Sequence, residues 1–139
     1  MLNFKIALLS IIIFFSCSTN TEPVDTLSSD YDVYIRPTGE ADENYQEFSF
    51  TNNTNHTLYY VGFSKTTPFF AAQMQTDSGW VSYIYWRCAT GIQLIEFVPS
   101  ETIRTNVPLP PDNLPWKVGL SVRNEADGED YYSWSTIQN

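Results

Sequence analysis

Glu47-Phe48-Ser49-Phe50-Thr51, followed by Asn52-Asn53-Thr54-Asn55 and by residues 57–65, is the stretch that decides the fold of this chain. Phe48 and Phe50 alternate with polar neighbours, which is the period-two pattern of a strand with one buried face. The asparagine cluster is typical of a turn, because asparagine tolerates left-handed backbone and hydrogen-bonds its own main chain. An apolar-rich segment follows directly in residues 57–65. The stretch therefore predicts two strands joined by a turn.

The same alternation continues on both sides of this stretch, and no window has the 3.6-residue apolar stripe of a helix. It predicts further strands in residues 31–36, 69–76, 80–87, 92–98, 103–109, 118–122 and 131–137. The strands of residues 69–76 and 80–87 form a hairpin across Asp77-Ser78-Gly79, and Pro108 places its strand at a sheet edge. About eight or nine short strands at this spacing predict an all-β, antiparallel, immunoglobulin-like β-sandwich over residues 31–139. A small barrel or a jelly roll is the alternative.

The first seventeen residues have the layout of a secretory signal. Lys5 precedes an uncharged apolar run that ends at Phe15, and Ser16-Cys17 follows. The run is too short to span a bilayer, which needs about 20 residues. The segment resembles the signal of bacterial lipoproteins, whose cysteine becomes the lipidated first residue of the mature protein. This resemblance implies a signal peptide over residues 1–16 and lipid attachment at Cys17.

The resemblance also implies a cellular location. The chain is expected on the bacterial cell envelope with a lipid anchor in the membrane, and Ser18 in place of an aspartate after the cysteine implies the outer membrane. Residues 17–30 are rich in Ser, Thr and acid, and almost lack large apolar residues. Such a composition cannot bury enough surface to order itself, so it predicts a flexible tether.

Charge excludes two classes of partner. The chain has sixteen acidic residues against seven basic ones and a net charge of −9. Nucleic-acid binding requires Lys and Arg to neutralise phosphates, and a polybasic membrane-surface role requires them too. We therefore expect neither function.

A run of aromatic residues in residues 80–87 is the most unusual feature of the predicted domain. Exposed planar rings with polar handles stack on sugars and anchor protein interfaces. Trp80 and Trp86 fall on one face of the predicted strand and Tyr83 and Tyr85 on the other, and one of the two sets is expected to be exposed. The candidate ligand-binding residues are therefore Trp80, Tyr83, Tyr85 and Trp86. The alternative is structural, because sandwich cores commonly hold a tryptophan and tyrosine pairs stabilise sheets.

Catalytic and metal-binding patterns are weak, so we expect neither an enzyme nor a cofactor. Cys88 and His56 are the one thiol–imidazole pair, and a buried inert thiol explains Cys88 better. The acids of residues 40–47 lie in a loop without the apolar cover that glycoside hydrolysis needs. The acidic segment from Glu125 to Asp130 does not fit an EF-hand, and we interpret it as a solvated hairpin loop, with an irregular calcium site as the open alternative.

A second resemblance spans about ninety residues and is to small bacterial secreted and lipoprotein domains of unknown function. Its features are residues 48–53, Tyr60-Val61-Gly62, Gly79-Trp80, residues 88–91, Pro99-Ser100 and residues 116–119. It implies a sandwich. Together these patterns predict a non-enzymatic envelope module that binds another envelope protein or supports an assembly. The alternatives are a glycan-binding module and an enzyme inhibitor that presents the proline-rigidified loop of residues 108–115.

Overall fold

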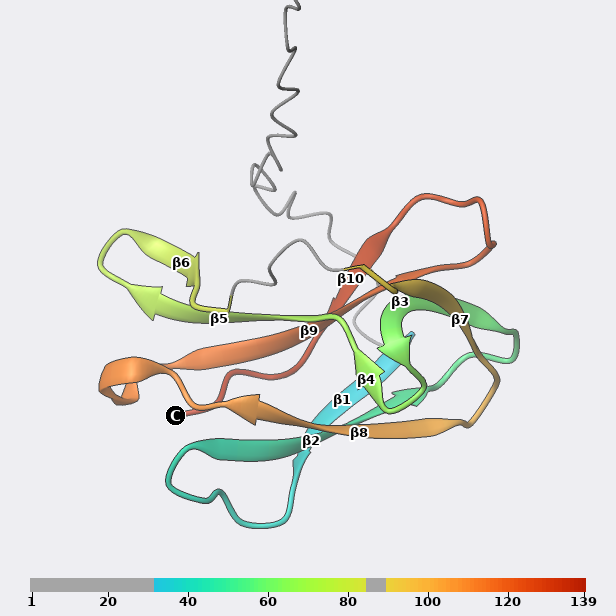
Figure 1. Cartoon of the computed structure of the whole chain (residues 1–139). Helices are drawn as coiled ribbons and strands as arrows, with labels where there is room; N and C mark the ends of the chain where they lie inside the picture. The colour runs from blue at the N-terminus through green and yellow to red at the C-terminus, as the bar shows by residue number, and fades with distance from the viewer. Residues whose placement is uncertain (1–31, 85–89) are drawn as a thin grey trace, which may run out of the picture.

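Two antiparallel sheets form the domain (Figure 1). The computed structural model describes residues 32–84 and 90–139. The smaller sheet has the order β1-β2-β8, with bounds Val33–Thr38, Tyr45–Asn52 and Thr102–Pro108. The larger sheet has the order β4-β3-β9-β5-β6, with bounds Thr67–Pro68, Leu58–Ser64, Trp116–Arg123, Phe70–Thr76 and Gly79–Ser82. In addition, β7 (Gln93–Phe97) pairs with β3, and β10 (Tyr131–Trp134) pairs with β9.

Strand β9 organises the larger sheet because it pairs with three strands. Residues 119 and 120 of β9 pair with both β5 and β10, so these two strands lie on opposite edges of β9. Val122 pairs with both Tyr131 of β10 and Tyr60 of β3. Strands β3 and β5 therefore share one edge of β9, one after the other, and β10 covers the other edge.

The core lies between the two sheets and forms one cluster. Phe48 and Phe50, the alternating apolar residues of β2, are fully buried in it. The ring of Phe48 meets Trp116 of β9 edge to face, with 5.4 Å between ring centroids, and this contact joins the sheets. The inward residues of β9 are Val118, Leu120 and Val122, which alternate with the outward Lys117, Gly119, Ser121 and Arg123.

The asparagine turn after β2 is a second link between the sheets. Asn52 is buried, and its side-chain amide donates to the carbonyl of Phe97 in β7 at 2.6 Å and to that of His56 at 3.0 Å. Its Oδ1 accepts from the amide of Thr54 at 2.9 Å. One side chain thus closes the turn and fixes the end of β7.

The predicted all-β antiparallel fold is confirmed, and two packed sheets fit the predicted β-sandwich; the immunoglobulin-like topology stays a prediction. The β5–β6 hairpin and the edge position of Pro108 in β8 are confirmed. Two details differ. The short strand β4 was not predicted, and β6 ends at Ser82. Beyond this end, the amide of Tyr83 still donates to the carbonyl of Ala72 in β5 at 3.2 Å, and its hydroxyl donates to the carbonyl of Pro108 at 3.0 Å.

Several sequence predictions concern residues outside the described part of the chain. These are the signal peptide, Cys17, the tether, Tyr85, Trp86 and Cys88. Across residues 32–84 and 90–139, no helix is long and apolar enough to cross a membrane.

Candidate functional site

The two described members of the predicted aromatic platform lie on opposite faces of the larger sheet. Trp80 pairs with Gln75 on the outer face and is half-buried. Tyr83 packs against the core, with its ring 6.4 Å from that of Trp116. Burial raises the pKa of Tyr83. The two residues therefore do not form one surface.

Trp80 instead belongs to a cluster that the sequence analysis missed, which we call the Lys117 cluster: Trp80, Lys117, Tyr132 and Trp134. The ammonium of Lys117 lies 4.7 Å from the Trp80 ring centroid and 4.4 Å from that of Trp134. Tyr132 stacks beside Trp134 with 5.3 Å between centroids. A lysine between two indoles is a cation–π arrangement. Lys117 lies in β9 between the core residues Trp116 and Val118, but sequence alone does not show that β6 and β10 both come close to Lys117.

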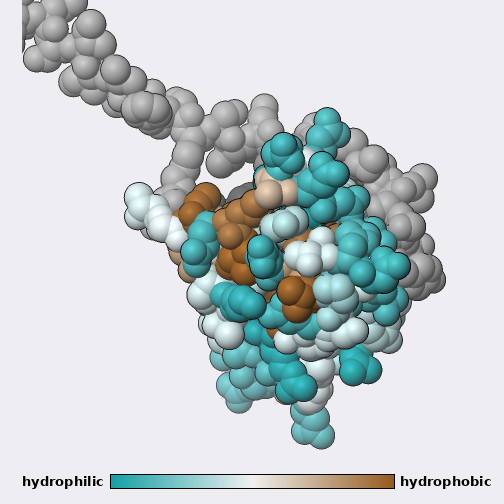
Figure 2. Space-filling model, turned by 90° about the vertical axis from the view of Figure 1, so that its right-hand side faces the viewer, coloured by the Kyte–Doolittle hydropathy of each residue, from teal (hydrophilic) through white to brown (hydrophobic). Residues whose placement is uncertain are grey.

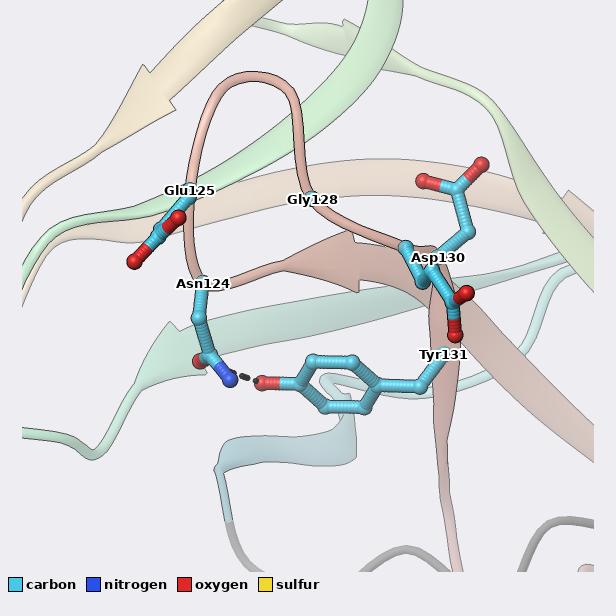
Figure 3. Close-up of a pocket in the computed structure, with 6 residues that line it drawn as sticks. Asn124, Glu125, Gly128, Asp130 and Tyr131 are labelled. Carbon is cyan, nitrogen blue, oxygen red and sulfur yellow. Dashed lines mark hydrogen bonds between the residues drawn. The ribbon is translucent and has the colours of Figure 1, made fainter.

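The acidic loop between β9 and β10 borders an open hollow of about 450 Å³ (Figure 3). Figure 3 shows Glu125 and Asp130 on opposite sides of it. Asp130 accepts two hydrogen bonds from Arg123, at 2.8 and 3.3 Å, so its charge is already compensated. Among the described residues, no three His, Cys, Asp or Glu side chains come together to hold a metal ion.

The carboxylates of residues 40–47 have structural contacts. Asp42 accepts hydrogen bonds from the backbone amides of Asn44 at 2.7 Å and Tyr45 at 2.6 Å, which makes a tight turn. Glu47 accepts from the hydroxyl of Thr38. Glu40, Asp42 and Glu43 are exposed. Glu40, Asp42 and Glu43 thus do not lie in the apolar cleft that glycoside hydrolysis needs.

His56 lies on the surface, with its Nε2 3.2 Å from Oδ1 of Asn124. Cys88, which the sequence analysis interprets as a buried inert thiol and not as a catalytic partner of His56, lies outside the described residues.

The proline loop that follows β8 is held at both ends. The amide of Leu109 donates to the carbonyl of Asn44, and the amide of Gln75 donates to that of Pro115, both at 2.8 Å. Its tip, Pro111–Asn113, is exposed. The loop is therefore fixed at both ends and exposed at its tip, as an inhibitor loop requires. Its exposed tip is only three residues long.

A group of exposed large apolar residues lies on one face of the larger sheet, in β7, at its two ends and in the adjacent β3. Ile92, Leu94 and Val98 are 49%, 40% and 42% exposed, and Phe63 of the adjacent β3 is 37% exposed. Leu94 pairs with Val61, and Gln93 donates to the carbonyl of Phe63 at 3.1 Å, so these residues are neighbours. We call Ile92, Leu94, Val98 and Phe63 the β7 strip.

A polar border surrounds apolar side chains on this side of the molecule. Figure 2 views the molecule from the side on which β7 lies in Figure 1, and it shows brown apolar residues bordered by teal polar ones. Exposed apolar groups with such a border are typical of protein-binding surfaces.

Within the described part of the chain, β7 pairs with β3 alone, and we call its other edge, with which no described residue pairs, the open edge. The sequence analysis missed this site because residues 92–98 are apolar on both faces. Such a run is typical of a strand covered on both sides.

Comparison with family models, with characterised proteins and with solved structures finds no match to this chain.

Proposed function

We propose that this chain is a non-enzymatic, lipid-anchored, immunoglobulin-like module of the bacterial envelope, and that it binds an envelope protein through the β7 strip. The observation that carries the proposal is the exposure of four large apolar side chains on and beside one edge strand. Leaving such side chains in water costs about 25 cal/mol for each Å² of apolar surface, and a partner removes that cost. Monomeric proteins seldom keep such a surface without a use for it.

The lipid anchor rests on the sequence of residues 1–17. Its test is metabolic labelling of the full chain with an alkyne fatty acid, followed by membrane fractionation. We expect label and membrane association in the wild type, and loss of both in Cys17→Ser. Membrane association of an unlabelled wild type would contradict lipidation at this residue.

The non-enzymatic assignment is supported by the contacts of the candidate groups. The carboxylates of Asp42, Glu47 and Asp130 bind backbone amides, a hydroxyl and a guanidinium. These carboxylates lie at an exposed surface. A hydrolase, by contrast, holds its catalytic groups in a cleft that excludes water.

Site-specific photo-cross-linking in the host tests the binding surface. A photoreactive residue at Leu94 is expected to give one discrete protein adduct. The matched control is Tyr34, which is 50% exposed on the outer face of the smaller sheet. Binding of the identified, purified partner to the full chain should then fall at least tenfold in Leu94→Lys. An adduct of equal yield from Tyr34, or full affinity in Leu94→Lys, would overturn the proposal.

Glycan binding is the second candidate, and the Lys117 cluster is the observation that favours it. Two indoles and a tyrosine around an amine combine rings that stack on sugars with a hydrogen-bond donor for hydroxyls. A glycan array separates the candidates. Binding that is lost in Trp134→Ala and kept in Leu94→Lys would favour the glycan, and binding to no glycan would remove it.

A further inference from the structure

We propose that the partner binds by adding an extended strand to the open edge of β7, so that backbone hydrogen bonds continue the larger sheet beyond Gln93–Phe97. The inference rests on the proposed protein-binding function and names its recognition mode. Strand addition is a recurring way for a sheet edge to bind an extended peptide: main-chain bonds supply affinity and alternate side chains supply specificity.

The other sheet edges carry features that prevent such pairing. Folded proteins protect edges with proline, with charged side chains or with very short strands. Strand β1 contains Arg36 and Pro37, and β8 contains Arg104 and Pro108. Strands β4, β6 and β10 have two, four and four residues. Strand β7 contains no proline, its one charged residue is Glu96, and apolar residues flank its exposed face.

Strand β7 is also held in place before any partner arrives. All five of its residues pair with β3. The Asn52 side chain donates to the carbonyl of Phe97 at 2.6 Å and ties the end of β7 to the smaller sheet. Ile95 and Phe97 are buried in the core. A pre-ordered edge loses little conformational entropy on binding, which favours affinity.

The outer face of β7 specifies the chemistry of the partner strand. Ile92, Leu94, Glu96 and Val98 alternate outward, and Glu96 is exposed and has no ion pair with any described residue. Directly opposite residues of an antiparallel pair interact, and opposite charges stabilise the pair. The matching strand therefore has apolar residues opposite Leu94 and Val98, and Lys or Arg opposite Glu96.

This chemistry argues against a second copy of the chain as the occupant. Two β7 strands related by a two-fold axis pair antiparallel. The two outer faces then lie on the same side of the joined sheet, and each residue of the outer face of 92–98 is opposite a residue of the same set in the other copy. This set contains no cation, so Glu96 lies opposite Glu96 or an apolar residue. Two copies also each carry a net charge of −9. A different protein with a basic residue in its strand avoids both problems.

A synthetic peptide tests the mode directly. The probe is acetyl-Val-Thr-Lys-Thr-Ile-Thr-Val-amide, whose lysine faces Glu96 when the peptide runs antiparallel to β7. Its binding to the full chain is measured by fluorescence anisotropy. Two N-methylated versions block alternate backbone amides, one at the three threonines and the other at the lysine and isoleucine. We expect one version to lose at least tenfold in affinity and the other to keep it, since alternate amides of an added strand point toward its neighbour.

Charge reversal tests the register. In Glu96→Lys, affinity for the lysine probe should fall about threefold or more, and a probe with glutamate in place of lysine should regain it. The matched control is Glu129→Lys, the same change on the exposed loop before β10, which should leave both affinities unchanged. Circular dichroism of each variant verifies that it is folded.

Three outcomes would overturn the inference. If the probe shows no saturable binding, or if both N-methylated versions bind as well as the parent, β7 does not pair with a strand, while cross-linking at Leu94 still decides the proposed function. If the chain forms a concentration-dependent dimer that Leu94→Lys abolishes, a second copy is the occupant.

Discussion

Asn52 shows how one polar side chain specifies this fold. It is buried at the end of β2, where it accepts from the turn at Thr54 and donates to His56 and to Phe97. Buried polar groups with all their partners rigidify a core, and removing one leaves the others unsatisfied. The sequence analysis placed a turn here from the asparagine cluster, but the link from Asn52 to a strand forty-five residues away depends on tertiary packing.

We expect Asn52→Ala to lower the free energy of unfolding by about 3 kcal/mol, because the carbonyls of His56 and Phe97 lose a donor and the turn loses its acceptor. The measurement is urea unfolding followed by circular dichroism. Asn53→Ala, at the adjacent exposed residue, is the control and should change stability by less than about 0.5 kcal/mol. Equal effects of the two variants would contradict a role for the Asn52 clamp.

Gly119 holds the Lys117 cluster against the sheet. A Cβ at this residue would lie 2.6 Å from Cε3 of Trp134 and within 2.9 Å of two further ring atoms. The indole therefore lies on the backbone of β9, an approach that only a residue without a side chain permits. Nothing in the local sequence of residues 118–122 shows this contact, because Trp134 comes from the neighbouring strand.

Gly119→Ala should destabilise the chain by about 1 to 3 kcal/mol, because the indole must move off the sheet. It should also change tryptophan fluorescence, since the ring loses its packing. The matched control is Ser121→Ala on the same strand and face, with an expected change of less than about 0.5 kcal/mol. Unchanged fluorescence and stability in Gly119→Ala would show that Trp134 does not pack there.

Strand β7 illustrates what local pattern can and cannot predict about an element. The sequence of residues 92–98 predicts a strand, and β7 occupies Gln93–Phe97. The pattern does not separate buried from exposed apolar residues, because each alternate set contains apolar residues and one polar residue, Gln93 or Glu96. Exposure of Leu94 follows from the edge position of β7, and this position depends on pairings between distant residues.

Two substitutions within β7 separate its folding role from its binding role. Phe97→Ala should cost about 3 to 5 kcal/mol, because Phe97 is fully buried and packs edge to face on Tyr60. Leu94→Ala, three residues earlier and 40% exposed, should cost less than about 1 kcal/mol. Thermal unfolding of both variants gives the comparison. A loss in Leu94→Ala as large as that in Phe97→Ala would mean that the β7 strip serves the core.

At the scale of the whole molecule, period-two alternation, turn residues and the absence of helical stripes were sufficient to predict the all-β fold. They did not predict the Lys117 cluster, which forms where β6, β9 and β10 come together. Nor did they predict the open edge, which depends on the pairing of β7 with β3. The aromatic platform predicted in residues 80–87 assumed one continuous strand, whereas β6 ends at Ser82. The hydrogen bond from the Tyr83 hydroxyl to Pro108 of the smaller sheet is a tertiary contact that the local sequence does not show.

The dependence of the free energy of unfolding on alkaline pH tests how tightly the two sheets pack around their tyrosines. Burial, together with the carboxylate of Glu101, raises the pKa of Tyr60 to about 12 from its ordinary value of 10.0. Burial also raises the pKa of Tyr131 and Tyr132. The phenol of the unfolded chain releases its proton first, so the contribution of these tyrosines to stability is constant below about pH 10 and falls as the pH rises toward 12.

Tyr60 alone should contribute a loss of about 2 to 3 kcal/mol across this window. Urea unfolding at pH 9 and pH 11.5 measures it, and phenolate absorbance reports ionisation. Tyr60→Phe should be less stable by about 1 kcal/mol at pH 9, because the hydrogen bond to the carbonyl of Lys65 is lost, and its stability should depend less on pH. An identical pH slope in the variant would show that Tyr60 does not titrate with folding.

Hydrogen–deuterium exchange of the full chain, with and without the partner captured at Leu94, tests the central claim most directly. We predict slower exchange of β7 amides in the complex, while the amides of β1 and β8, the edges that carry proline and arginine, exchange at their free rates. Unchanged exchange in β7, with protection appearing instead around Trp134 and Lys117 or at the Pro111–Asn113 tip, would contradict the claim and move the binding surface to that site.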